Sequence, residues 1–283
     1  MEIFEEIEPL RAFLQGKRSA LNSIGLVPTM GALHAGHLAL IRACKAENEV
    51  TVSSIYVNPA QFNNQTDLDK YPRSLEADIE MLKAEGCQVL FAPQDTEMYS
   101  GKSLTFDFGS LDKVLEGEFR PGHFSGVALV VSKLFNIVQP DRAYFGQKDY
   151  QQFQIINQLK EELKFPVELH SVPIVREKSG LALSSRNQRL SDENKTQALF
   201  LYHSLTDAKD QILNGVPFAE IKSEVERRAK QNRGVQLEYF ELANKNTLQP
   251  LEDLKDIHNG IILIAAFVNN VRLIDNILLE KKR

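Results

Sequence analysis

Short apolar segments alternate with amphipathic segments along the first two thirds of the chain. The apolar segments are rich in β-branched residues and predict strands, whereas the amphipathic ones repeat at helical spacing. The predicted strands lie at 23–28, 50–57, 88–92, 143–145 and 167–175. The predicted helices lie at 3–17, 37–46, 74–85, 125–138 and 149–163. This alternation is typical of an α/β fold in which helices cover both faces of a mostly parallel sheet.

The pattern changes beyond about residue 185. Two charged helical segments, 192–213 and 217–231, precede predicted strands at 236–242, 260–267 and 271–278. Helices followed by strands, without further strand–helix–strand alternation, indicate a smaller α+β domain. We place the boundary in the Gly- and Ser-containing stretch 178–188, which gives an N-terminal domain of residues 1–182 and a C-terminal domain of residues 183–283.

Composition and charge exclude several classes of protein. The 283 residues carry a formal net charge of −5, which argues against a broad surface for nucleic acid. The acidic N-terminus has no signal-peptide pattern, and no apolar run approaches the roughly 20 residues of a membrane span. Cys44 and Cys87 show neither disulfide nor zinc spacing, so we expect both to pack in the interior. These features predict a cytoplasmic protein that binds neither nucleic acid nor a membrane.

The strongest chemical signal follows the first of these predicted strands. Residues 28–37 read Pro-Thr-Met-Gly-Ala-Leu-His-Ala-Gly-His, and the His-x-Gly-His end opens a predicted helix. A helix N-terminus binds phosphate because its backbone N–H groups are unpaired and carry partial positive charge. His34 and His37 share one helical face and can both donate hydrogen bonds to phosphate, and Gly36 lets a planar base approach the backbone. This is the nucleotidylyl-transfer signature; the alternative is two ordinary surface histidines.

A second signal follows the predicted strand 143–145, again where a helix begins. Gly146 allows a close approach, and Lys148 is a flexible charge that can reach phosphates. Asp149 can cap the helix or accept a ribose hydroxyl. A purely structural helix cap is the alternative for this segment.

Two further loops carry polar side chains suited to ligands. The small-residue loop 176–187 occupies the place of the mobile KMSKS loop of class I aminoacyl-tRNA synthetases, and its Ser184, Ser185 and Arg186 suit triphosphate oxygens. Asn58 and Gln61, after the predicted strand 50–57, can recognise hydroxyl and carboxylate groups. A solvated linker and a simple Asn-Pro turn are the respective alternatives.

Taken in order, these segments resemble the pantothenate synthetase family. The matching runs are PTMGALHAGH (28–37), VNPAQF (57–62), DKYPR (69–73), EGEFRPGHF (116–124) with Gly126 and Val127, FGQKDYQQ (145–152) and LALSSRN (181–187). They span residues 27–187, and the C-terminal third matches only in length and outline. The histidine motif alone specifies a superfamily, whereas the whole ordered set is specific to this family.

The resemblance implies a Rossmann-like parallel-sheet domain with a smaller C-terminal α+β lid domain, in a homodimer. It also implies an ATP- and Mg²⁺-dependent ligase. ATP and (R)-pantoate would first give pantoyl-adenylate and pyrophosphate. β-Alanine would then displace AMP to give pantothenate, a coenzyme A precursor.

The resemblance also implies roles for individual residues. His34, His37, Lys148 and Arg186 would be catalytic, with His37 the expected proton donor, and Gln61, Gln152 and Asn58 would bind the substrates other than ATP. The family often has two adjacent acidic residues near a metal, where this chain has Ala77 and Asp78, so Asp78 is the one expected metal ligand. The ATP site would comprise Met30, Gly31, His34, Gly36, His37, Gly146, Gln147, Lys148, Asp149, Val175, Leu183, Ser184, Ser185 and Arg186.

Three rival functions remain open at this point. A nucleotidyltransferase of the same superfamily would keep AMP in its product and need no amine. A tRNA-charging enzyme is disfavoured by the acidic charge and the absence of an evident anticodon-binding segment. A nucleotide-binding sensor would bind ATP without turning it over.

Overall fold

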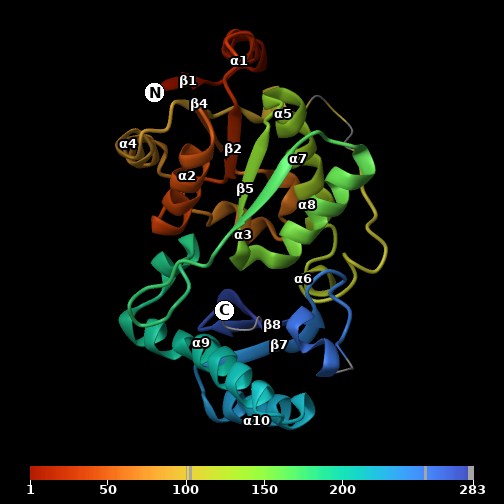
Figure 1. Cartoon of the computed structure of the whole chain (residues 1–283). Helices are drawn as coiled ribbons and strands as arrows, with labels where there is room; N and C mark the ends of the chain where they lie inside the picture. Colours follow the sequence, from red (N-terminus) through yellow and green to blue (C-terminus); the bar gives the residue numbers. More distant parts are fainter. Residues whose placement is uncertain (100, 102–103, 252–253, 280–283) are drawn as a thin grey trace. The chain divides into compact units, whose positions relative to one another are not determined.

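The structure, a computed structural model, describes residues 1–99, 101, 104–251 and 254–279 (Figure 1). The chain forms two compact units, one of Met1–Gln147 with Gln151–Pro173 and the other of Lys148–Tyr150 with Ile174 onward. The second unit starts at Ile174, whereas the sequence pattern places the domain boundary at 182/183. The reason is local: Arg176 pairs with Ala182 in a β-bridge and with Asp275 in an ion pair, which attaches this segment to the second unit.

A six-stranded parallel sheet forms the first unit. Its strand order is β1-β4-β3-β2-β5-β6, which confirms the predicted α/β fold. The strands are β1 (Glu2–Phe4), β2 (Ile24–Thr29), β3 (Val50–Ile55), β4 (Val89–Phe91), β5 (Arg142–Gly146) and β6 (Glu168–Val172).

The helix predicted for residues 3–17 is wrong at its start. Glu2–Phe4 is the edge strand β1, which pairs with β4, and helix α1 begins only at Ile7 (Ile7–Ser19). The backbone N–H of Ile7 donates to Glu97 Oε1 at 2.7 Å, and that of Ala92 donates to the Phe4 carbonyl at 2.8 Å. A strand of three residues is too short to show a period of two, so the helical spacing of Ile3 and Ile7 misled the pattern.

Helices cover both faces of this sheet, as predicted. Helix α2 (Ala35–Glu47) packs on β2, β3 and β5 and against α4 (Leu75–Glu85). Helix α7 (His123–Val138) packs on β2 and against α1, on the other side of the sheet from α2 in Figure 1. The remaining helical segments are η1 (Pro59–Gln61), α3 (Gln65–Asp69), α5 (Asp95–Met98), α6 (Glu116–Phe119), η2 (Gln147–Asp149) and α8 (Tyr150–Leu163).

Both cysteines lie in the core of the first unit. Cys44 and Cys87 are unbridged and buried beside Ile41, Leu82 and Leu90. This confirms the packing role predicted for them.

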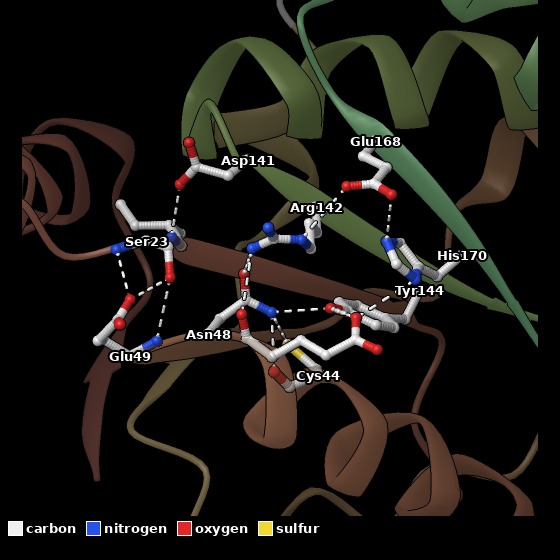
Figure 2. A network of polar contacts seen from close by, with 11 residues as sticks. Ser23, Cys44, Asn48, Glu49, Asp141, Arg142, Tyr144, Glu168 and His170 are labelled. Atoms are coloured by element: carbon white, nitrogen blue, oxygen red, sulfur yellow. Dashed lines mark hydrogen bonds and ion pairs between the residues drawn. The ribbon is translucent and has the colours of Figure 1, made fainter.

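A polar network ties together the starts of four neighbouring strands (Figure 2). The carboxylate of Asp141, just before β5, accepts the N–H of Ile24 in β2 at 2.7 Å. Asn48, at the end of α2, donates to the hydroxyl of buried Tyr144 at 2.8 Å, and burial raises the pKa of that hydroxyl. His170 of β6 stacks on Tyr144, with ring centroids 4.9 Å apart. These contacts hold the N-terminal ends of the strands in register. The loops that follow the strands lie at the opposite, carboxyl ends.

The second unit is α+β, as predicted. Its strands β7 (Val235–Asn244), β8 (Gly260–Val268) and β9 (Val271–Leu278) form an antiparallel sheet in the order β7-β8-β9. Helices α9 (Asp192–Leu213) and α10 (Phe218–Gln231) pack on this sheet. The described part of this unit also contains the 3₁₀ segments η3 (Ser185–Arg189) and η4 (Leu254–Asn259), and most of η2 belongs to it as well.

The strand order of the first unit predicts where a ligand binds. From β2 the chain moves through α2 to β3 on one side, whereas β5 lies on the other side of β2. Parallel sheets bind ligands at such a reversal, outside the carboxyl ends of the strands. The loops that follow β2 and β5 therefore flank the expected site.

Within the described ranges, no helix is long and apolar enough to cross a membrane.

Candidate active site

His34 and His37 cap the N-terminus of helix α2 with their own side chains. His34 is the N-cap residue, and its Nδ1 accepts the N–H of Gly36 at 3.1 Å. His37 reaches back, and its Nδ1 accepts the N–H of His34 at 3.3 Å. The two rings lie 4.0 Å apart between centroids. This is a capping box in which imidazoles replace the usual hydroxyl and carboxylate.

The capping box decides which ring nitrogen carries the proton. A nitrogen that accepts a backbone N–H has its lone pair engaged, so in each neutral imidazole the proton sits on Nε2. His34 and His37 therefore each present an Nε2–H donor at a helix N-terminus. Such a pair of donors suits an anionic ligand, above all a phosphate.

The loop between β2 and α2 is held by a buried carboxylate. Asp78, in the first turn of α4, is fully buried, and its two oxygens accept the N–H groups of Ala32 and Leu33, each at 2.8 Å. Gly31 has φ +79°, and a Cβ there would lie 3.0 Å from Asp78 Oδ2. The loop therefore needs glycine both for its backbone angle and for space.

The same contacts bear on the metal expected at Asp78. Both of its oxygens already accept backbone N–H groups, and Ser74 Oγ also donates to Oδ1, at 3.3 Å. In the part of the chain that the structure describes, no group of three or more His, Cys, Asp or Glu side chains is arranged to hold a metal ion. Metal ligation by Asp78 stays a prediction, and this geometry favours a role in holding the loop.

Asn58 and Gln61 form a buried amide pair after β3. Asn58 is 1% exposed and Gln61 7%. Asn58 Nδ2 donates to Gln61 Oε1 at 3.1 Å, and Gln61 Nε2 lies 3.1 Å from Met30 Sδ. The loop after β3 is thus joined to the loop after β2, as expected of residues that share one site.

Helix α7 supports this amide pair through a close backbone contact. A Cβ on Gly126 would lie 2.1 Å from the carbonyl oxygen of Ala60, so only glycine fits where η1 crosses α7. His123 Nδ1 lies 2.8 Å from the Gln61 carbonyl oxygen. These contacts give a structural reason for the Gly-His-Phe-Ser-Gly run of α7.

At the end of β5, Gly146 leaves open space. A Cβ added there would meet no atom within 4 Å. Gln147 and Gln152 are half-buried. Gln151 is instead structural: its amide is buried and bonds the N–H of Glu116 and the carbonyls of Leu111 and Val114 at 2.8–2.9 Å.

The other predicted site residues belong to the second unit. Lys148 Nζ lies 3.5 Å from Asp149 Oδ2, and the Lys148 carbonyl accepts Asn276 Nδ2 at 3.0 Å. The Val175 carbonyl accepts the N–H of Leu183 at 3.0 Å. These two contacts tie the residues to the framework of their own unit.

The predicted Ser-Ser-Arg segment forms the start of η3. Ser184 is its N-cap and accepts the N–H of Arg186 at 3.3 Å. Ser185 is buried, and Arg186 is half-buried. The segment is an ordered 3₁₀ turn rather than a plain linker. Its proposed contacts with triphosphate stay a prediction.

Sequence reasoning missed three polar side chains that hold these loops. Tyr99 donates to Asn58 Oδ1 at 2.6 Å across 41 positions of sequence. Arg176 forms two bonds with buried Asp275, at 2.6 and 2.9 Å, across 99 positions. Burial raises the pKa of Asp275, while Arg176 opposes that rise. No local motif could reveal these pairs, because their partners meet only in the folded chain.

Comparison with known proteins identifies the family. A sequence profile of the pantoate-beta-alanine ligase family matches residues 2–278. Pantothenate synthetases from Aquifex aeolicus and Cytophaga hutchinsonii are 49% and 46% identical to this chain, over 97% and 96% of its length and 97% of each relative.

Solved structures agree with this result. The crystal structure of pantothenate synthetase from Thermus thermophilus is 40% identical with a TM-score of 0.92, and the match covers 99% of this chain and 100% of that chain. Pantoate-beta-alanine ligase from Francisella tularensis, complexed with beta-gamma ATP and beta-alanine, is 34% identical with a TM-score of 0.77 and matches 100% and 99% of the two chains. The chain therefore belongs to the pantoate–β-alanine ligase family and is a ligase.

Proposed function

We propose that this ligase uses ATP to condense (R)-pantoate with β-alanine through a pantoyl-adenylate. The observation that carries the proposal is the imidazole capping box of helix α2, in which both Nδ1 atoms accept backbone N–H groups. Two Nε2–H donors at one helix N-terminus suit the phosphates of a nucleotide. The complex of the Francisella tularensis relative with an ATP compound and beta-alanine supports ATP and β-alanine as ligands here.

In the first step, a pantoate carboxylate oxygen attacks the α-phosphorus of ATP. A new C–O–P linkage forms, the bond between the α-phosphorus and the bridging oxygen breaks, and pyrophosphate leaves with the bonding electrons. Negative charge grows on the leaving group, so preorganised donors accelerate the step. We assign this role to Nε2–H of His34 and His37, which would donate hydrogen bonds to the negative charge that grows on the leaving pyrophosphate.

In the second step, the amine of β-alanine attacks the acyl carbon of the adenylate. AMP leaves with its oxygen, and the amine loses a proton as the amide forms. The protein's part is mainly to position the reactants, which alone accelerates such a step greatly. Gln61 would hold pantoate and meet β-alanine, because its buried NH₂ group suits hydroxyl and carboxylate oxygens. Gln152 would also hold pantoate.

The polar residues of the second unit complete the proposal. Lys148, Ser184 and Arg186 would contact phosphate oxygens, Asp149 the ribose, and the unit would act as a lid. Magnesium would enter with ATP as part of the substrate, because the oxygens of Asp78 are taken by backbone N–H groups. A homodimer is a further proposal that rests on the family resemblance, and a cytoplasmic location is one that rests on the composition of the chain.

Exchange of labelled pyrophosphate into ATP tests the two-step mechanism. With β-alanine left out, the exchange should require pantoate, because only reversible adenylate formation returns label to ATP. The same assay with phosphate monoesters in place of pantoate tests the nucleotidyltransferase alternative. No pantoate-dependent exchange by protein that binds ATP would contradict the proposal.

A further inference from the structure

The backbone fixes the orientation of the Asn58 side-chain amide. Asn58 Nδ2 donates to the carbonyl oxygen of Gly126 at 3.1 Å, and Asn58 Oδ1 accepts the N–H of Ala60 at 3.3 Å. A carbonyl can only accept and an N–H can only donate, so the amide cannot be flipped without breaking both bonds. Asn58 therefore has one defined orientation in the buried interior.

That orientation passes to Gln61. The second N–H of Asn58 donates to Gln61 Oε1 at 3.1 Å, so the oxygen of the Gln61 amide faces Asn58. Its Nε2 faces the opposite way, toward Met30 Sδ at 3.1 Å. A thioether is a weak acceptor, so the NH₂ group keeps donor capacity for a stronger partner. Gln61 thus presents a donor rather than an acceptor on the side of the β2–α2 loop.

Tyr99 makes the shortest bond in this chain of contacts. Its hydroxyl donates to Asn58 Oδ1 at 2.6 Å. The centroid of the Tyr99 ring lies 4.8 Å from Lys133 Nζ. Lys133 Nζ also donates to the Met98 carbonyl at 2.6 Å. Burial raises the pKa of the Tyr99 hydroxyl to about 12, so it stays a donor at neutral pH. Asn58 therefore holds the Tyr99 hydroxyl, and Lys133 contacts the face of the ring.

We infer that Tyr99 is a positioning residue that acts through Asn58 to keep the NH₂ group of Gln61 turned toward the carboxylate of the acid substrate. The inference rests on the proposed function insofar as Gln61 binds pantoate. Without the Tyr99 hydroxyl, the Asn58 side chain keeps only its three longer bonds, to the Gly126 carbonyl, the Ala60 N–H and Gln61 Oε1. The Gln61 amide then rotates more freely and spends part of its time with its oxygen toward the substrate carboxylate. Two oxygens that face each other in this way repel, so the substrate binds more weakly.

Tyr99→Phe tests the inference, because it removes the hydroxyl and keeps the ring. We expect the KM for pantoate to rise about 5- to 10-fold, as for the loss of one buried hydrogen bond. The KM for ATP should stay unchanged. Since the hydroxyl is protonated up to a pKa of about 12, the ratio of variant to wild type should be constant between roughly pH 6 and 9.

Tyr56→Phe is the matched control. Tyr56 stands beside Tyr99, with ring centroids 6.4 Å apart, and its hydroxyl donates to Asp95 Oδ1 at 2.9 Å instead of to Asn58. Tyr56→Phe should leave the KM for pantoate within about 2-fold of wild type, because it removes no bond to Asn58 or Gln61. Equal effects of the two variants, or equal rises in both KM values for Tyr99→Phe, would overturn the inference.

A second measurement does not depend on the reaction. The side-chain NH₂ signals of Asn58 and Gln61 are assigned in ¹⁵N-labelled protein by their loss in Asn58→Asp and Gln61→Glu. Both signals should shift or broaden in Tyr99→Phe and stay in place in Tyr56→Phe. Unchanged signals in Tyr99→Phe would refute the inference that Tyr99 acts on Gln61 through Asn58. Failure of the proposed function would show separately, as wild-type protein without pantoate-dependent exchange.

Discussion

Asp78 in the first unit and Asp275 in the second are both buried, yet they are held by different kinds of partner. The oxygens of Asp78 accept two backbone N–H groups, from Ala32 and Leu33. Those of Asp275 meet the guanidinium of Arg176 and the N–H of Asn276. The first carboxylate shapes a loop of main chain, and the second joins two segments through side chains.

This difference decides what mutation can do at each place. The partners of Asp78 are backbone groups, so no second substitution can remove them and the loop depends on this one side chain. The main partner of Asp275 is another side chain, so both members can be replaced together. We therefore expect single substitutions to be harmful at both places and a compensated pair only in the second unit.

The largest expected effect is the loss of Asp275 alone. Asp275→Leu leaves the half-buried guanidinium of Arg176, whose side chain is 20% exposed, without its counter-charge, which should lower the free energy of unfolding of the second unit by about 3 kcal/mol. Urea denaturation followed by circular dichroism measures this. Asp207→Asn, which breaks an exposed ion pair with Arg228, is the control and should cost at most about 1 kcal/mol. Similar losses in both variants would contradict the view that burial makes the difference.

Asp78→Asn should have the next largest effect. An amide can accept at only one position, so the N–H of Ala32 or Leu33 is left unsatisfied and meets an NH₂ group instead. We expect a loss of about 2 kcal/mol in stability, together with weaker ATP binding because the loop carries His34. Calorimetric titration of ATP measures the binding. Glu76→Gln, at an exposed acid in the same helical turn, is the matched control and should bind ATP normally.

The double variant Arg176→Met/Asp275→Leu should be less affected than Asp275→Leu. Replacing a buried ion pair as a pair with apolar residues is often nearly neutral, so we expect a stability within about 1–2 kcal/mol of wild type. The residual loss reflects the bond from Arg176 to the Gly180 carbonyl and the contact of its guanidinium with the Tyr202 ring. Additive losses in a double-mutant cycle would show that the two residues do not act as a pair.

The smallest expected effect concerns the cysteines. Burial raises the pKa of Cys44 to about 12 and that of Cys87 to about 11. Both thiols therefore stay neutral in the folded protein at neutral pH. The stability that this confers is fully present below the thiol pKa of the unfolded chain, about 9, and declines as the pH rises above that value. At pH 8 we expect negligible alkylation by iodoacetamide in native protein, and full alkylation in urea. Rapid alkylation of native protein would contradict the buried placement.

Much of the fold follows from local pattern. Helix α9 spans Asp192–Leu213 as its periodicity predicts, and β9 spans Val271–Leu278. The motif at 28–37 also predicts a helix N-terminus after a strand, where the structure has His34 as the N-cap. These features depend on spacing within one segment, so sequence alone reveals them.

Other features depend on partners far away in the chain. Strand β1 exists because Glu2–Phe4 pairs with β4. The bonds from Asp78 to the N–H groups of Ala32 and Leu33 carry no side-chain signal, so sequence alone could not show them. The contact of Tyr99 with Asn58 is equally invisible in sequence.

The sequence by itself therefore determined most of the strands and helices, though not strand β1, as well as the two kinds of domain and the family to which the chain belongs. Hydrophobic periodicity and motif spacing are written in consecutive residues. Only the tertiary structure decided which nitrogen of His34 and His37 carries the proton, what Asp78 binds and how the Gln61 amide is turned. Each of these depends on the direction of a backbone N–H or carbonyl group, and such directions exist only once the chain has folded.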